Sequence, residues 1–260
     1  MISWFESLPT PLAGLVVVGG FVGFSLLIGY LVGRFTSQEV RSAHNDRAGF
    51  ILAVIGVIYA VLLAFVAIGV WERFQEAQAR SFDEAGALAT VYRDAGSFRD
   101  GARLRSVLRT YAIWVAQEEW PRMRRGEKSE VSSPLLEEAD REIRGLSVDS
   151  ARLADVQAQM LSAMETALTG REERLTVYAR GINGIIWLVL IVGAVVTVAF
   201  TCLFGFERTV MQQLMIGGLS FLIGLVLFLI LALDFPYRGS ISVTPEAFQG
   251  LLETFSAIGP

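Results

Sequence analysis

Residues 44–72 read HNDRAGFILAVIGVIYAVLLAFVAIGVWE: four polar residues, then a long apolar run that ends in Trp71-Glu72. The stretch 50–71 carries no charged residue and is about as long as the ~20 helical residues that cross a bilayer core. No turn signal follows Trp71, whose indole ring suits the membrane interface. We therefore predict a membrane span over about 50–71 that continues out of the membrane as one long helix.

Three further stretches are equally free of charge, at about 12–33, 183–204 and 210–233. The chain of 260 residues is 53% hydrophobic with a mean hydropathy of +0.51, which is too apolar for an ordinary soluble domain. Buried helices of a soluble core usually keep one polar stripe. We predict four spans, in a first pair within 1–71 and a second pair within 181–233.

The polar middle, 72–180, has 17 Lys and Arg and 19 Asp and Glu, interspersed as on a solvated surface. Its apolar residues recur at a spacing of three or four in three stretches, which is typical of helices. The stripes are Trp71, Phe74, Gln78, Phe82, Ala85, Leu88 and Tyr92; Leu104, Leu108, Tyr111 and Val115; and Val156, Met160, Met164, Ala167, Leu175 and Tyr178.

These stripes predict a helical bundle, formed partly by extensions of the second and third spans. A partner-binding groove is the alternative. Residues 121–134 are the best candidate for a loop, because they hold both prolines of the middle region. The fold class is therefore an all-α membrane protein: four transmembrane helices and a helical-bundle extramembrane domain.

The polar start of the second span, His44, Asn45, Asp46 and Arg47, has two interpretations. Asn45 or Asp46 can cap the helix and satisfy its first N–H groups before lipid begins. Alternatively, the four residues form a charged ring at a pore mouth, in which His44 titrates near neutral pH.

Small residues also mark one face of the second span. Their spacing of three and four places them together, and such faces let membrane helices approach closely. A narrow apolar pore lining that gates by dewetting is the alternative. The residues are Ala53, Gly56, Ala60, Ala64 and Ala67.

The fourth span ends in Asp234-Phe235-Pro236, which predicts a helix-exit corner with Arg238 near enough to pair with Asp234. Thr244-Pro245-Glu246 then opens a short amphipathic helix in the tail, 234–260. We expect its apolar face (Phe248, Leu251, Leu252 and Phe255) to dock on the protein or lie at the membrane interface.

The sequence argues against catalysis and against nucleic-acid binding. One histidine, one cysteine and no P-loop or GxSxG motif leave no catalytic constellation, no metal site and no cofactor site. The net charge of −4 does not suit nucleic acid. Arginines on the short loops place the middle domain outside the cytoplasm, but those at the ends of the domain reverse the count, so its side stays open.

Several short motifs follow one another along the sequence and together cover most of the chain. They are His44-Asn45-Asp46, Tyr59, Val70-Trp71-Glu72, Ala85 through Tyr92-Arg93, Tyr111, Glu119-Trp120-Pro121, and Asp234 to Gly239 through Thr244 to Phe248. In these motifs the chain resembles the bestrophin-like family of bacterial integral membrane proteins.

The resemblance implies kinship to bestrophins, which are pentameric anion channels with four spans per subunit. We therefore expect a homo-oligomer in the inner-membrane bilayer that passes small anions such as chloride. The alternative is a membrane-anchored sensor or scaffold that conducts nothing.

Overall fold

The computed structural model describes residues 10–35, 45–127, 133–179, 181–204 and 209–259. Among these residues the secondary structure is helical and contains no strand, which confirms the all-α class. Contacts divide the chain into two compact units. We call them the membrane unit (Leu8–Glu72 and Ile182–Asp234) and the bundle unit (Arg73–Gly181 and Phe235–Pro260).

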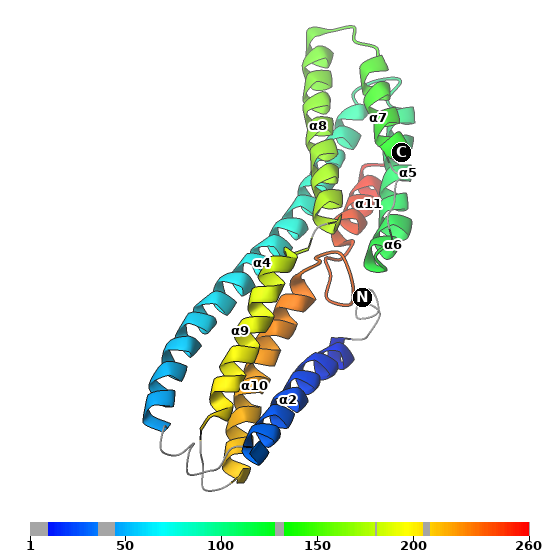
Figure 1. Ribbon diagram of the computed structural model, residues 1–260. Coiled ribbons are helices and arrows are strands. Elements are labelled where there is room, and N and C mark those ends of the chain that lie inside the picture. Colours follow the sequence, from blue (N-terminus) through cyan, green and yellow to red (C-terminus); the bar gives the residue numbers. More distant parts are fainter. Residues whose placement is uncertain (1–9, 36–44, 128–132, 180, 205–208, 260) are drawn as a thin grey trace. The chain divides into compact units, whose positions relative to one another are not determined.

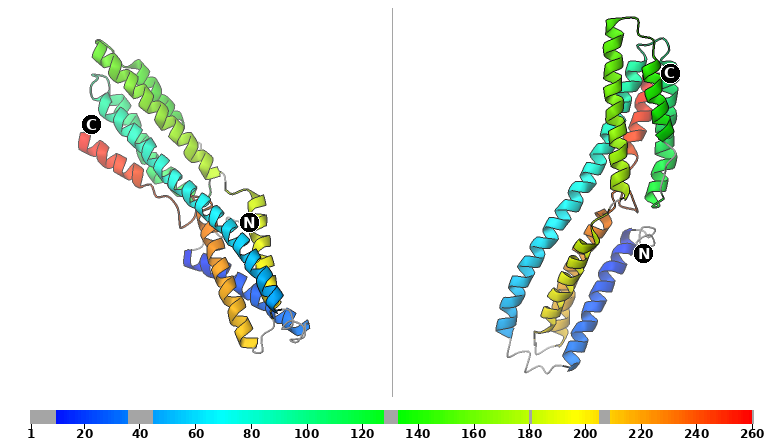
Figure 2. Two further views of the ribbon diagram at one scale, coloured as in Figure 1. Left: turned by 90° about the vertical axis from the view of Figure 1, so that its left-hand side faces the viewer. Right: turned by 45° about the horizontal axis from the view of Figure 1, so that its top comes forward.

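Four helices are long and apolar enough to cross a membrane, which confirms the four predicted spans. They are α2 (Thr10–Phe35), α4 (Asn45–Ala95), α9 (Gly184–Cys202) and α10 (Thr209–Leu233). Helices α2, α9 and α10 run side by side (Figure 2). Glycines permit this packing: a Cβ on Gly224 would meet the Val18 backbone at 3.4 Å, and one on Gly29 would meet Ile216 at 2.7 Å.

Helix α4 is a single helix of 51 residues, as predicted for the second span (Figure 1). Its membrane part needs an unbroken backbone ladder, because lipid offers no hydrogen-bond partners. Neither proline nor a turn motif interrupts the helix after Trp71, so the same ladder continues to Ala95. One helix therefore contributes to both units.

The bundle unit packs the end of α4 with short and long helices around a common core. The core includes Leu88 of α4, Leu108, Met160 and Phe248, all with no exposed surface. The other helices are α5 (Ala102–Trp114), the π-helix η1 (Val115–Glu119), α6 (Trp120–Arg124), α7 (Ser133–Gly145), α8 (Ala151–Ala179) and α11 (Glu246–Ile258).

The tail helix α11 docks on this core through Phe248, Leu251 and Phe255, which are all buried, so the first of the two expected positions is correct. The helix begins at Glu246 and Pro245 is its N-cap, one position later than the predicted N1 proline. Proline fits there because its carbonyl accepts the first helical hydrogen bonds, from Phe248 and Gln249.

Two details differ from the sequence-based expectations. The third span is a separate helix, because α8 ends at Ala179 and the Asn183 side chain caps α9 by accepting from the Ile185 N–H at 3.0 Å. In the expected loop 121–134, both prolines lie in first helical turns instead, Pro121 in α6 and Pro134 in α7. Proline is tolerated there because the N–H that it lacks has no partner inside the helix.

Because α4 is unbroken, we expect the double substitution Glu76→Gly and Ala77→Pro to disrupt it strongly. Proline in a helix interior costs about 3 kcal/mol, and Ala77 is also buried. We expect the bundle unit to become sensitive to limited proteolysis. The control is Val148→Pro, in the exposed connection between α7 and α8. Equal protease resistance of both variants would contradict a continuous helix.

Candidate functional site

The first part of α4 is the candidate site. Helix α4 begins at Asn45, so Asn45, Asp46 and Arg47 lie in its first turn. His44 lies outside the described residues. The capping and pore-mouth interpretations of these residues both stay predictions.

The small-residue face of α4 is left largely uncovered by the described part of the chain. Ala53, Ala60 and Ala64 are exposed, whereas Gly56 and Ala67 are half-buried. A Cβ on Gly56 would meet no atom within 4 Å. Only 11% of the most apolar window of α4 is buried, against 33% for α9 and for α10. A large part of α4 is thus available to lipid or to a second copy of the chain.

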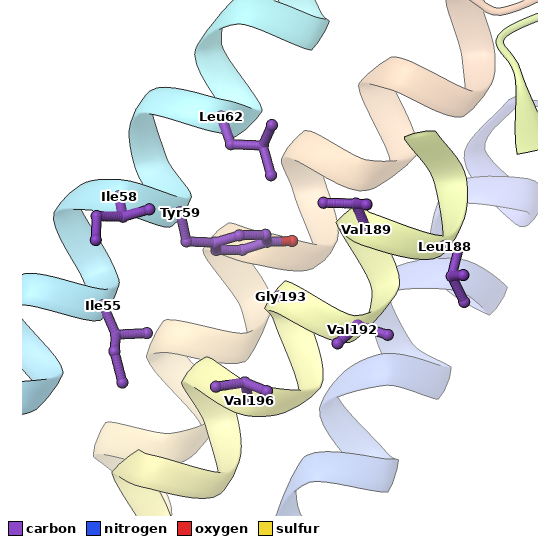
Figure 3. A pocket seen from close by; sticks show the side chains of 9 residues that line it. All are labelled: Ile55, Ile58, Tyr59, Leu62, Leu188, Val189, Val192, Gly193 and Val196. Carbon is purple, nitrogen blue, oxygen red and sulfur yellow. The ribbon is translucent and has the colours of Figure 1, made fainter. Parts of the chain in front are cut away.

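Tyr59 joins α4 to α9 within the membrane unit. Its side chain extends toward α9 at Gly193 (Figure 3), and its hydroxyl donates to the Leu190 carbonyl at 2.8 Å. A Cβ on Gly193 would come within 2.5 Å of two carbons of the Tyr59 ring. Glycine at position 193 therefore permits the contact.

Sequence reasoning noted Tyr59 only as part of the family resemblance and did not single out Gly193. The available signal was the phenolic hydroxyl in an otherwise apolar run. A buried hydroxyl needs a hydrogen-bond partner, and the partner had to come from another span. Which span supplies it is not encoded in the local pattern.

The helix-exit corner is built from hydrogen bonds to Asp234. Its carboxylate accepts from the Ile182 backbone N–H at 2.5 Å and from Trp187 Nε1 at 3.1 Å, so it fixes the start of α9. Pro236 follows the end of α10, and its carbonyl accepts from the Val243 N–H at 2.7 Å.

Arg238 belongs to the bundle unit. Its guanidinium donates to the Tyr178 carbonyl at 3.0 Å and lies over the rings of Tyr178 and Phe235, at 4.6 and 4.5 Å from their centroids. Asp234 belongs to the membrane unit. The proposed pair between Asp234 and Arg238 stays a prediction.

The bundle unit holds a buried cluster of charges that sequence reasoning did not assemble. Arg174 donates to both oxygens of Glu84, at 2.9 and 3.3 Å, and also to Glu119. Arg171 donates to both oxygens of Glu119 at 3.2 Å, and Tyr111 donates to Glu84 at 2.5 Å. Two acids and two arginines balance each other, as buried charges require.

Burial and pairing shift the pKa of two members of this cluster, Tyr111 and Arg174. Burial, reinforced by the Glu84 carboxylate, raises the pKa of the Tyr111 hydroxyl well above its ordinary value. Burial alone would lower the pKa of Arg174, but the adjacent carboxylates of Glu84 and Glu119 outweigh it and raise that pKa well above the ordinary value. Tyr111 therefore stays neutral and Arg174 stays charged at physiological pH.

The π-helix explains part of the local geometry. Pro121 has no N–H, so the turn before it loses a hydrogen bond and widens, and the Trp120 N–H bonds to the Val115 carbonyl five residues back. Trp120 stacks beneath Arg174, whose guanidinium carbon lies 5.0 Å from the centre of its ring. Its indole N–H donates to the Val243 carbonyl at 2.9 Å.

This arrangement links α4, η1 and α8 within the bundle unit. Each charged group of the cluster pairs with another member, and the described residues contain no group of three or more potential metal ligands. Four spans together with a helical bundle define an integral membrane protein of the all-α class.

A family model described as the Bestrophin-like domain matches residues 19–248. The match spans most of the chain, so the chain belongs to the bestrophin-like family, as its motifs suggested. No curated protein matches the sequence significantly.

Solved structures share the fold. A bacterial bestrophin homologue from Klebsiella pneumoniae matches with a TM-score of 0.68 and 14% identity, over 93% of this chain and 98% of the other. A single-substitution variant of a bestrophin homologue from the same organism gives a TM-score of 0.69 at 14% identity over the same shares. At this identity the likeness concerns the fold alone.

The buried cluster predicts a large effect of Arg174→Met. The substitution leaves Glu84 buried without its cationic partner, which costs about 3–5 kcal/mol. We expect the midpoint of unfolding to fall markedly. The transition is monitored by tryptophan fluorescence in detergent. The control is Arg103→Met, which removes two pairs from a side chain that is 70% exposed and should change little. Equal midpoints for the two variants would show that the cluster does not stabilise the bundle.

Proposed function

We propose that this protein is a homo-oligomeric channel of the bacterial inner membrane that passes small anions such as chloride passively. The observation that carries the proposal is the uncovered small-residue face of α4, on a span whose most apolar window is only 11% buried. Membership of the bestrophin-like family supports it, because bestrophins are anion channels.

The proposed assembly places the α4 helices of several copies around one axis. Ala60 and Ala64 are exposed and small, so neighbouring backbones can approach closely there. A ring of such faces encloses a narrow apolar passage, and apolar constrictions of this kind gate by dewetting. The same residues then serve both interpretations of the stripe, as contacts between copies and as a pore lining.

Charges at the start of α4 would set the ion preference. Arg47, and His44 when protonated, are positive, and an oligomer repeats each of them once per copy. Their summed field attracts anions to the pore mouth. Asp46 acts in the opposite sense, so selectivity depends on which side chains face the passage.

Ala60→Phe tests the assembly. The added ring overpacks a close helix contact, at a cost of about 1–3 kcal/mol. We expect a smaller oligomer by size-exclusion chromatography with light scattering, or blocked chloride efflux from liposomes. The control is Ala199→Phe on α9, because Ala199 is also an exposed alanine of a span. Unchanged mass and unchanged flux in Ala60→Phe would show that this face contacts only lipid.

Arg47→Ala and His44→Ala test the pore mouth. Chloride efflux from liposomes is measured at about pH 5.5 and about pH 7.5, on either side of the ordinary histidine pKa of about 6.5. We expect the unaltered protein to conduct better at the lower pH, because protonated His44 adds positive charge. Arg47→Ala should conduct less at both values, and His44→Ala should lose part of the pH dependence.

Two results would change the assignment. Flux of potassium without chloride would replace the anion channel by a cation channel. No flux of either ion, from vesicles that contain folded oligomer, would favour the alternative function of a membrane-anchored sensor or scaffold.

A further inference from the structure

An apolar groove of about 460 Å³ runs between α4 and α9 within the membrane unit. Its volume lies in the range of about 300–1,000 Å³ that is usual for small-molecule sites. Figure 3 shows side chains from both helices around it. The walls include Ile55, Ile58 and Leu62 of α4 and Leu188, Val192 and Val196 of α9.

Tyr59 and Gly193, which contact each other, also line the groove. The Tyr59 hydroxyl is the one polar side-chain group among the lining residues, and it already donates to the Leu190 carbonyl. Every other lining side chain is aliphatic, apart from Gly193. The groove therefore offers an occupant dispersion contacts and no hydrogen-bonding side chain.

The depth of the groove restricts what can enter it. Its α4 wall spans residues 55–62, in the middle of the apolar run 50–71, and its α9 wall spans 188–196, inside Gly184–Cys202. Both walls thus lie at the level of the bilayer hydrocarbon. The occupant must be an apolar group that reaches this depth, either a second copy of the chain or a lipid acyl chain.

The direction of the groove favours the acyl chain, and this step rests on the proposed function. Ile58 and Leu62 are each two residues away from Ala60 along α4. In a helix of 3.6 residues per turn, a separation of two residues corresponds to a rotation of about 200° around the helix axis. The groove therefore lies on the opposite side of α4 from the small-residue face. If copies meet at that face, the groove faces away from the contact and toward lipid.

We infer that the groove between α4 and α9 binds one acyl chain of a membrane phospholipid. The chain fills the space beside the Tyr59–Gly193 contact and packs against both helices. An occupant of this kind supports the position of the proposed pore helix relative to the third span.

The test uses the full-length protein in liposomes that contain a trace of phospholipid with a photoreactive diazirine midway along one acyl chain. After irradiation, labelled peptides are mapped by mass spectrometry. We expect labels to concentrate on residues 55–62 and 188–196 rather than on the other exposed apolar surfaces of the spans. Labelling spread evenly over all exposed surfaces would mean surrounding lipid only and would overturn the site.

Matched variants on α9 sharpen the result. Val192 lines the groove and is 51% exposed, whereas its neighbour Ile191 is 47% exposed and lies outside the lining. Val192→Phe should reduce labelling of 55–62 by about tenfold, because the added ring occupies the space of the chain. Ile191→Phe should leave it unchanged. Equal labelling of the two variants would contradict the proposal.

Two further measurements keep the outcome independent of folding and of conduction. If Val192→Phe fails to fold, Val196→Phe replaces it as the test. It fills the groove from another position and should reduce the labelling of 55–62 by the same factor. Labelling that is absent from the groove in the unaltered oligomer would show that protein covers it, and would overturn the acyl-chain site. Concentrated labelling without any ion flux would retain the acyl-chain site and contradict only the channel.

Discussion

The rest of the structure depends on the constraint that a helix in lipid must satisfy its own backbone hydrogen bonds. In α4 this constraint produces an unbroken ladder from Asn45 to Ala95, so one helix contributes to both units. The backbone hydrogen-bonding groups of each span are then paired within that span. Contacts between spans then depend on side chains and on the room that glycines leave. In the membrane unit these contacts include the glycine contacts, the Tyr59 hydrogen bond and the hydrogen bond from Trp187 to Asp234.

The bundle unit uses a different source of specificity. Its core combines apolar packing with the paired charges of Glu84, Glu119, Arg171 and Arg174. Apolar contacts alone have little directionality, whereas a two-pronged arginine–carboxylate pair has a defined geometry. Several residues that carry the family resemblance in this unit are buried, including Tyr111, Trp120, Tyr237 and Phe248. We interpret those motifs as requirements of the bundle.

Local patterns predicted the four spans and the continuation of α4, because charge-free length and helical periodicity are properties of neighbouring residues. They did not predict the break at Asn183, where a single cap ends one helix and begins another. The partners of Glu84 could not be found either, although Ser81 and Leu88 place it on the buried face of α4. Arg174 lies 90 residues away. The role of the small-residue face of α4 stays a prediction, because its proposed partner is another copy of the chain and the sequence of one chain does not specify an assembly.

We propose that the small-residue face of α4 borders a water-filled ion pathway. Single cysteines are placed along α4 in a Cys202→Ala background and exposed in liposomes to an anionic, membrane-impermeant thiol reagent. We expect reaction at positions 53, 60 and 64 and none at 58 and 62, which face the groove. Reaction at 58 and 62 alone, or at no position in vesicles that pass chloride, would contradict it.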